Sequence, residues 1–342
     1  MTRVHVWGAS GYAASEAIAF LWAHPLVELG LLESASLAGE QVGLHFPRLR
    51  TLDRTFDCPG AILSAIGQDD VVIMGGARGA AKEVAPKFLE AGARVIDLSD
   101  DFRLAPTRAV YGLPERYKAQ IAGARFVANP GCYPTATLLA VLPLAEFDIA
   151  QIIVDAKSGI TGAGRKPSVR ALYAEVADDI HAYGLEGHRH EAEIVQELNA
   201  AGIDAPLVFT PHVVPLARGM LADAYVVMGA APDAAAVRAA YARFYGGNPF
   251  VRLLDEGVSP SVAAVAYTND AEIAVSVHGN VVRAICAIDN LGKGAAAQAV
   301  MNLNIMLGFP EESGLTQVST TLDRASPFDS LRSLRSKHVR SG

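Results

Sequence analysis

Residues 1–14 read Met-Thr-Arg-Val-His-Val-Trp-Gly-Ala-Ser-Gly-Tyr-Ala-Ala, and this stretch decides the fold. Its apolar beginning predicts a short strand, Gly8 and Gly11 predict a turn, and a helix is expected over Ser15–Trp22. A strand, a glycine turn and a helix start present unpaired backbone N–H groups to a pyrophosphate. Ala14 takes the third small position of this variant dinucleotide fingerprint. The stretch therefore predicts a nucleotide-binding domain.

Strand-like and helix-like segments alternate up to about residue 131. The strand-like runs are almost entirely apolar, as expected for a parallel sheet that is covered on both faces. We therefore expect residues 1–131 to form a Rossmann-type α/β domain. The predicted strands are Val27–Leu32, Val71–Met74 and Ala93–Leu98, and the predicted helices are Ala61–Ile66 and Ala80–Ala91.

The pattern changes after residue 131. Further strand-like runs follow without regular helices between them, which predicts an α+β domain with a mainly antiparallel sheet. Such a sheet can bury one face on helices and offer the other to a partner subunit, so residues 132–292 are expected to form a catalytic and dimerisation domain. The runs are Ile152–Ala156, Leu207–Thr210, Ala224–Met228, Ala263–Tyr267, Ile273–His278 and Val281–Ala287.

The end of the chain divides into a helix and a tail. Gly294–Leu307 has the apolar periodicity of an amphipathic helix, and we expect it to pack back on the first domain. Residues 293–315 would then complete that domain. Residues 316–342 are polar and end with several basic residues, and a solvated tail is a better interpretation than an anion-binding one.

The composition is typical of a globular cytoplasmic protein. Hydrophobic residues make up 51% and charged residues 19%, and the net charge of -7 argues against nucleic acid as a partner. The cysteines Cys58, Cys132 and Cys286 form neither a disulfide framework nor a metal knuckle, so a reducing compartment and no metal are expected. No apolar run approaches the roughly 18 residues of a membrane span, and the first residues lack a signal-peptide pattern.

Cys132 is the strongest candidate for chemistry. It lies in Asn-Pro-Gly-Cys-Tyr-Pro-Thr-Ala at residues 129–136, between a glycine turn and an apolar segment, Thr137–Leu144, that predicts a buried helix. A helix N-terminus carries about half a positive charge and favours a thiolate over a thiol. An isolated cysteine is more often a small buried filler, but this setting predicts a nucleophile.

Three other segments carry candidate site residues. Ser158–Arg165 is a glycine-rich loop with hydroxyls and an arginine, which is typical either of phosphate binding or of an ordinary surface loop. His188 and His190 would share a face only in an extended chain, and an acid–base role beside a cysteine is favoured over zinc because no third ligand follows at a suitable spacing. Asp97–Arg103 follows a predicted strand at the edge where α/β ligands bind.

These segments together resemble the N-acetyl-gamma-glutamyl-phosphate reductase family of arginine biosynthesis, which is similar to aspartate-semialdehyde dehydrogenase. The resemblance runs from about residue 3 to 315, and its most specific part is the cysteine segment. It implies a two-domain dehydrogenase whose partners are a small acyl phosphate, inorganic phosphate and copies of the same chain in a dimer or tetramer. The similar segments are 8–12, 95–99, 101–103, 110–115, 127–136, 155–159, 162–165, 187–190, 209–212 and 287–290.

The resemblance also implies roles for single residues. Cys132 would attack N-acetyl-L-glutamyl 5-phosphate to give a thioester, which NADPH reduces to the semialdehyde. His188 or His190 would stabilise the thiolate and protonate the oxyanion, and the sequence leaves open which does which. The expected substrate contacts are Arg103, Asn129 and Arg165. The expected cofactor contacts are Gly8, Ala9, Ser10, Gly11, Tyr12, Ser34, Ser36, Ser158, Gly159 and Asn290.

Three departures from the family pattern bear on specificity. Ala35 stands where the family carries an arginine suited to a 2′-phosphate, and Glu33 lies where a carboxylate holds a ribose diol in NAD enzymes. NADP is thus the family expectation, but NAD remains open. Residues 76–79, Gly-Ala-Arg-Gly, replace the usual Pro-His-Gly, and the segment between Arg103 and Tyr111 is shorter than is common.

Alternative functions remain open at this stage. One is a reductase of a carrier-linked aminoadipyl or glutamyl phosphate, although Tyr133-Pro134 and the net charge of -7 favour the arginine enzyme. Aspartate-semialdehyde dehydrogenase is another. A nucleotide-sensing relative without catalysis would not need Cys132, both histidines and Arg165 together.

Overall fold

The stretch that opens the chain folds as predicted. In the computed structural model, which describes residues 1–105 and 107–315, β1 (Thr2–Trp7) leads through the glycine turn into α1 (Tyr12–Trp22). The helix begins directly after Gly11, whose backbone is extended, so the N–H groups of its first turn face the end of β1. Residues 316–342, with the predicted tail, lie outside the described residues.

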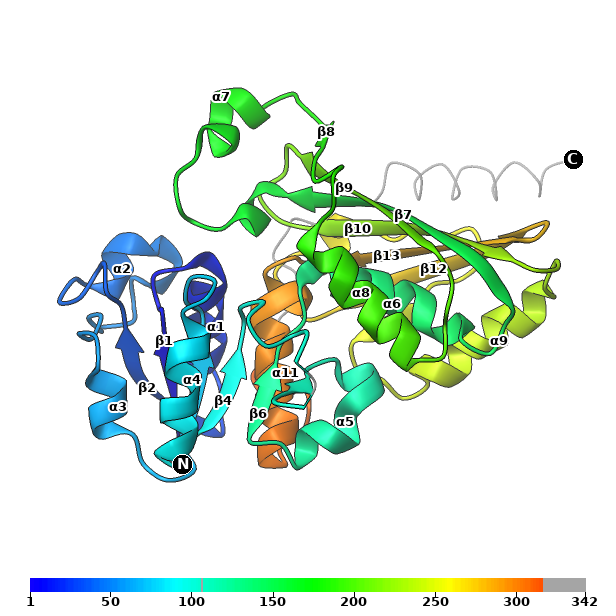
Figure 1. Cartoon of the computed structure of the whole chain (residues 1–342). Coiled ribbons are helices and arrows are strands. Elements are labelled where there is room, and N and C mark those ends of the chain that lie inside the picture. Colours follow the sequence, from blue (N-terminus) through cyan, green and yellow to red (C-terminus); the bar gives the residue numbers. More distant parts are fainter. Residues whose placement is uncertain (106, 316–342) are drawn as a thin grey trace, which may run out of the picture.

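The first sheet has six parallel strands in the order β2-β1-β3-β4-β6-β5, which confirms the Rossmann-type prediction (Figure 1). The sequence missed its last two strands because two or three residues are too few to show a period. The strands are β2 (Val27–Glu33), β3 (Val71–Met74), β4 (Arg94–Asp97), β5 (Val110–Tyr111) and β6 (Phe126–Ala128). The helices are α2 (Val42–His45), η1 (Pro47–Leu49), α3 (Ala61–Ala65), α4 (Ala81–Glu90) and α5 (Pro114–Ala122).

The strand order reverses at β1, which pairs with β2 on one side and with β3 on the other. Ligands of such sheets bind at this point, beyond the carboxyl ends of the strands. Gly8, at the end of β1, has a φ of +72°, and a Cβ there would lie 2.7 Å from the backbone nitrogen of Gly76 after β3. Only glycine therefore fits between the two loops, and the backbone stays open to a ligand.

The second sheet has seven strands in the order β11-β12-β13-β10-β7-β9-β8. Four of its neighbouring pairs are antiparallel, and the pairs β7–β9 and β11–β12 are parallel, so the sheet is mixed but mainly antiparallel as predicted. The strands are β7 (Ile149–Gly159), β8 (His181–Ala182), β9 (Leu207–Val214), β10 (Met220–Met228), β11 (Val251–Leu253), β12 (Ala271–His278) and β13 (Val281–Ile288).

Two predictions for this region are wrong. Regular helices do lie between the strands, and Ala263–Tyr267 is not a strand, because its first residues belong to a helical turn and Tyr267 has a φ of +66°. Short apolar runs do not distinguish strand from helix by periodicity alone. The helices are η3 (Ile160–Ala163), η4 (Val169–Ala171), α7 (Tyr173–Val176), α8 (Arg189–Ala200), α9 (Ala234–Tyr245) and α10 (Val262–Val265).

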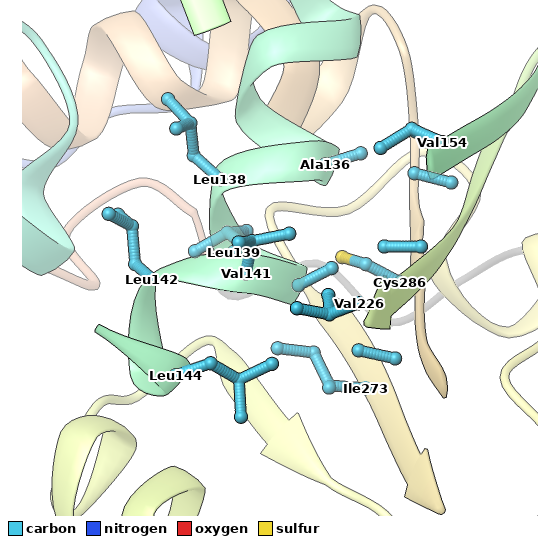
Figure 2. Packing of buried hydrophobic residues seen from close by; sticks show 14 of the residues in the cluster. Ala136, Leu138, Leu139, Val141, Leu142, Leu144, Val154, Val226, Ile273 and Cys286 are labelled. Atoms are coloured by element: carbon cyan, nitrogen blue, oxygen red, sulfur yellow. The ribbon is translucent and has the colours of Figure 1, made fainter. Parts of the chain in front are cut away.

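The core of the second sheet is built around α6 (Cys132–Val141), which continues into η2 (Leu142–Leu144). Every residue of α6 after Cys132 is buried, and full burial of each large aliphatic side chain contributes about 1.5–3 kcal/mol. Figure 2 shows α6 side chains such as Leu139 and Val141 beside strand residues that include Val226 and Cys286. The cysteine at the start of this helix is thus fixed to the rigid centre of the domain.

The C-terminal helix differs from the prediction in one respect. A π-helical turn, η5 (Gly292–Ala296), precedes α11 (Ala297–Leu307), and α11 lies against α1, β4 and α5 of the first sheet's domain (Figure 1). It is buried on every side rather than amphipathic. The amide nitrogens of two of its polar side chains are paired inside the protein, since Gln298 and Asn302 both donate to the Gly112 carbonyl. Among the described residues no helix has both the length and the apolar character to cross a membrane.

Candidate active site

A cavity of about 450 Å³ opens beside the start of α6 and brings several predicted site residues together. The carboxyl end of β7 and the N-terminus of α8 supply much of its wall, next to the cysteine helix. Among the described residues, no three His, Cys, Asp or Glu side chains gather as they would around a metal ion. The predicted residues in the wall are Cys132, Ser158, Gly159, His188 and His190.

Cys132 is the first residue of α6, as the helix-start prediction requires, and Gly131 precedes it as the N-cap. The surroundings of the sulfur favour the protonated thiol over the thiolate that the helix start predicted. Although the side chain keeps some exposure to the cavity, burial raises the pKa of the Cys132 thiol to about 11, and the charges of Arg103 and Arg189 offset this only in part. The resting group is therefore a thiol at neutral pH.

Both histidines face the same cavity, which the sequence allowed only for an extended chain. His188 is the N-cap of α8 with an extended backbone (φ -124°, ψ 137°), whereas His190 lies in the helix. Nδ1 of His188 accepts the backbone N–H of His190 at 3.2 Å, and the two ring centroids are 4.8 Å apart. The change from strand-like to helical backbone between them turns both rings to one side.

Both imidazoles are neutral at pH 7. Burial lowers the pKa of His188 to about 4, with a smaller effect from the charge of Arg189. Burial also lowers the pKa of His190 well below its usual range, together with the neighbouring charge of Arg103. The resting site is thus a thiol beside neutral imidazoles, and the expected stabilisation of a resting thiolate by a protonated histidine is absent.

Arg103 is buried under the cysteine turn. Its Nε donates to the Asn129 carbonyl and its Nη2 to the Leu98 carbonyl, each at 2.8 Å, and Nη1 lies 3.3 Å from Oε2 of Glu193 and 3.4 Å from Nε2 of His190. These contacts do not support the predicted substrate contact. The guanidinium instead holds the backbone of the turn in place.

Glu193 is a site residue that the sequence reasoning missed. Its Oε1 accepts the backbone N–H of Gly131 at 2.9 Å and the Tyr111 hydroxyl at 2.8 Å. Burial alone would lower the pKa of Arg103, but the adjacent Glu193 carboxylate raises it above its usual value, so the guanidinium stays charged. The available signal was its position three residues after His190, on the same face of α8.

The side chain of Asn129 is also buried and hydrogen-bonded within the protein. Its side chain is 1% exposed, its Nδ2 donates to the Ala295 carbonyl at 3.0 Å, and its Oδ1 accepts from Asn302 at 3.0 Å. These contacts tie the cysteine turn to η5 and α11, and they do not support the predicted contact with substrate.

The glycine turn and the end of β2 form the expected cofactor side. Gly8, Ala9, Ser10 and Gly11 make the turn, and Tyr12 begins α1. Ser36 Oγ lies 3.4 Å from Ser10 Oγ, whereas Ser34 is buried and its hydroxyl accepts the Leu37 N–H at 3.2 Å. The position of the Ser10 and Ser36 hydroxyls beside the start of α1 suits a bound phosphate.

Glu33 does not take the ribose position that its place in the sequence suggested. The side chain is buried, and its Oε2 accepts the backbone N–H of Ile62 near the start of α3 at 3.1 Å. A carboxylate is favourable at a helix N-terminus, so the side chain turns toward α3 and away from the exposed residues Ala35 and Ser36.

The remaining predicted residues come from the second domain. Ser158 donates to the Gly159 carbonyl at 3.0 Å, and a Cβ on Gly159 would lie 2.9 Å from the Leu216 carbonyl oxygen. Asn290 accepts the Gly219 N–H at 2.7 Å and donates to Thr161 at 3.0 Å, which holds the loop in position. Arg165 lies outside the cavity wall and donates to the Ser10 carbonyl at 3.1 Å.

Two family models match the chain. Residues 3–124 match "Semialdehyde dehydrogenase, NAD binding domain" and residues 132–290 match "Semialdehyde dehydrogenase, dimerisation domain". Solved structures agree on the fold: aspartate semialdehyde dehydrogenase II from Vibrio cholerae has a TM-score of 0.72 at 20% identity, over 90% of this chain and 98% of that one. The same enzyme with NADP from Candida albicans has a TM-score of 0.65 at 16% identity, with the same coverage. The two family models and the fold thus place the chain in the semialdehyde dehydrogenase class.

Curated relatives narrow this class. Proteins named N-acetyl-gamma-glutamyl-phosphate reductase match from Brevibacillus brevis, at 41% identity over 93% of this chain and 99% of the relative. One from Geobacter metallireducens matches at 42% identity over 92% of this chain and 98% of the relative. The chain belongs to the N-acetyl-gamma-glutamyl-phosphate reductase family.

Proposed function

We propose that the protein reduces N-acetyl-L-glutamyl 5-phosphate to N-acetyl-L-glutamate 5-semialdehyde and phosphate, with NAD(P)H as reductant, in arginine biosynthesis. The observation that carries the proposal is the single cavity into which Cys132, His188 and His190 open. A nucleophile and neutral bases in one enclosed space suit attack on an acyl phosphate, which is a good electrophile with a good leaving group. The names of the curated relatives support this substrate.

The hydrogen bonds of the two histidines indicate a different catalytic role for each. Nδ1 of His188 accepts a backbone N–H, so its neutral ring carries the hydrogen on Nε2 and serves as a donor. Nε2 of His190 faces the Arg103 guanidinium, which only donates, so this nitrogen carries the lone pair. A Cβ on Gly131 would lie 2.5 Å from the same nitrogen, which places it against the residue preceding Cys132. We assign His190 as the base and His188 as the donor to the oxyanion.

The covalent step then balances. His190 takes the proton of the Cys132 thiol, and the sulfur attacks the acyl carbon. His188 and the N–H groups at the start of α6 stabilise the tetrahedral oxyanion. As the carbonyl re-forms, the bond from carbon to the phosphate oxygen breaks, the proton on His190 passes to the departing phosphate, and a thioester remains on Cys132. The negative charge of the bound acyl phosphate favours protonated His190, which offsets its lowered pKa.

The glycine turn fits a dinucleotide, because Gly8 leaves no room for a Cβ and the N–H groups of α1 open toward the space beyond β1. Gly8, Ser10, Gly11 and Ser36 would hold it from the first domain, and Ser158 and Gly159 from the second. When bound, the nicotinamide supplies the hydride that reduces the thioester. His188 donates to the oxygen that becomes the aldehyde, and Cys132 leaves as thiolate and regains a proton through His190.

Substrate oxygens need a cation in the cavity wall, and this is Arg189. It begins α8 between the two histidines, its side chain is half exposed, and it lies 3.7 Å from Asp100. A guanidinium pairs readily with phosphate or carboxylate oxygens. We propose that Arg189 takes the substrate-binding role that was predicted for Arg103 and Asn129.

The proposal extends to organisation. Residues 1–131 with 293–315 would form the nucleotide-binding domain, and residues 132–292 the catalytic and dimerisation domain. The dimerisation domain of the matched family supports a homo-oligomer, for which we propose a dimer or tetramer. The three free cysteines suit a cytoplasmic enzyme.

Phosphate-dependent oxidation of N-acetylglutamate semialdehyde by the full chain, run beside aspartate semialdehyde and carrier-linked aminoadipate semialdehyde, tests the proposed reaction. We expect the N-acetylated aldehyde to have the highest kcat/KM and Cys132→Ser to have no turnover. A higher kcat/KM for either competitor would assign a different substrate. Full turnover by Cys132→Ser would exclude the thioester.

A further inference from the structure

We propose that Arg165, which the second domain supplies, binds the 2′-phosphate of NADP and provides the positive charge that Ala35 lacks. The inference rests on the proposed function, since it concerns the cofactor of that reaction. It moves Arg165 from the substrate, where the sequence placed it, to the nucleotide. It also makes cofactor preference a property of both domains together.

The position of Arg165 is the first observation. It lies between η3 and η4, beyond the carboxyl end of β7, yet its Nη1 donates to the carbonyl of Ser10 in the glycine turn at 3.1 Å. Its guanidinium carbon also lies 4.7 Å from the ring centroid of Phe46, beside η1. In Figure 1 the segment that leads to α7 descends toward this part of the first domain. The side chain therefore crosses from one domain to the nucleotide side of the other.

The second observation is what surrounds Ser10. Its hydroxyl lies 3.4 Å from the hydroxyl of Ser36, which follows β2, the strand whose end meets the 2′ position of the ribose in this class of fold. Ala35 and Ser36 are exposed there. The paired hydroxyls of Ser10 and Ser36 and the guanidinium of Arg165, which contacts the Ser10 carbonyl, thus lie at the same turn, and all three can donate to phosphate oxygens.

The third observation is the balance of charge. Two other arginines lie near the start of α1, but both are paired with Glu16, Arg48 at 2.6 Å and Arg218 at 2.9 Å. Within residues 1–105 and 107–315, Arg165 has no carboxylate in salt-bridge distance. Because Glu33 turns toward α3, it adds no repulsion at this point. Of these three arginines, Arg165 is the one without a carboxylate partner among the described residues, so its charge is available to an anion.

These observations predict a preference for NADP despite Ala35. The 2′-phosphate carries nearly two negative charges at pH 7, and a planar guanidinium can donate two parallel hydrogen bonds to its oxygens. Ser10 and Ser36 would donate to the remaining oxygens. A cofactor without the 2′-phosphate would lose these contacts and keep those of the glycine turn.

Calorimetric binding of 2′,5′-ADP and 5′-ADP to the full chain tests the inference without any turnover. We expect Arg165→Met to weaken 2′,5′-ADP by about 10- to 100-fold, the scale of one charge-assisted pair, and 5′-ADP by less than about twofold. Lys166→Met is the matched control, because Lys166 is the exposed next residue of the same loop, and it should change neither affinity. Adding Ala35→Arg to Arg165→Met should restore the preference for 2′,5′-ADP.

Two results would overturn the inference. Equal weakening of both ligands would place Arg165 on the diphosphate, and unchanged affinity for both would make its contact with Ser10 purely structural. A circular dichroism spectrum of Arg165→Met that matches the parent chain ensures that lost affinity is not lost folding. The binding measurement contains no acyl phosphate, so its result does not depend on whether the proposed reaction is correct. Conversely, unchanged nucleotide affinity in Arg165→Met would reject the role of Arg165 and would not bear on the proposed reaction.

Discussion

At the scale of single residues, burial and a helix N-terminus act in opposite directions on the pKa of the Cys132 thiol. The glycine turn and the apolar segment after it predicted a cysteine at a helix start, and Cys132 is the first residue of α6. Local pattern does not show how deeply protein surrounds the sulfur, and that burial outweighs the helix end. The thiol is therefore activated when substrate arrives, rather than held as a thiolate.

This state predicts an unusual pH profile for alkylation of the free enzyme. Because burial raises the pKa of Cys132 from 9.0 to about 11, its reaction with iodoacetamide should increase up to about pH 11, two units beyond an ordinary thiol. Exposed Cys58 should react first at pH 7–8, and buried Cys286 last. Peptide mass spectrometry after timed labelling measures all three, and a plateau for Cys132 below pH 8 would mean that a thiolate is already present.

Substitution of the two histidines should slow acylation to different extents. His190→Gln removes the base, so acylation by the acyl phosphate should slow by roughly 10²–10⁴-fold, as expected for general acid–base help. His188→Gln keeps a hydrogen-bond donor near the oxyanion, so it should slow acylation less than His190→Gln does. Single-turnover release of phosphate measures acylation directly. Equal losses in both variants would contradict the division of roles.

At the scale of elements, α8 both positions the histidines and contacts the cysteine turn through Glu193. His190, Glu193 and Glu197 follow one another at helical spacing and are all buried, so this polar stripe faces the protein rather than solvent. Glu193 connects α8 to the cysteine turn through the Gly131 N–H and to Arg103 through its second oxygen. The helix thus fixes the distance between the base and the nucleophile.

Glu193→Gln tests this link. The amide can still accept the Gly131 N–H, but Arg103 would be left as a buried charge without its counter-ion, which typically costs about 3–5 kcal/mol. Urea unfolding should show this loss. Glu191→Gln, on the less buried side of the same helix turn, is the control and should stay within about 0.5 kcal/mol of the parent. If both variants are equally stable, Glu193 does not compensate the charge of Arg103.

At the scale of the whole molecule, predictability follows the distance along the chain between interacting residues. The β1–turn–α1 unit and the start of α6 depend on neighbours in sequence, and both were predicted. Asn129 meets Ala295 across 166 positions and Arg165 meets Ser10 across 155. Such contacts leave no local period, so Asn129 and Arg165 were predicted to contact substrate. The polar residues of α11 similarly predicted an exposed face, because burial between other elements is a tertiary property.

One buried carboxyl should make a measurable contribution to how global stability depends on pH. Asp97, at the carboxyl end of β4, is fully buried, and its oxygens accept only from the backbone and hydroxyl of Ser99. Burial raises its pKa from 3.8 to about 6, and the Ser99 hydrogen bonds reduce the effect only in part. Between these values the folded chain holds a proton that the unfolded chain releases, so the free energy of unfolding should fall as pH rises from about 4 to 6.

The size and the origin of this fall are testable with Asp97→Asn. The amide keeps both contacts with Ser99 and carries no charge, so the variant should lose about 3 kcal/mol less than the parent over that range, at 1.36 kcal/mol for each pKa unit. Chemical unfolding at intervals of half a pH unit, with exposed Asp53→Asn as the control, isolates the contribution. Because other carboxyls titrate in both proteins, the difference between the two curves is the quantity that counts. A difference that stays constant from pH 4 to 7 would show that Asp97 remains ionised in the folded protein, and that the edge of the first sheet is better solvated than its burial indicates.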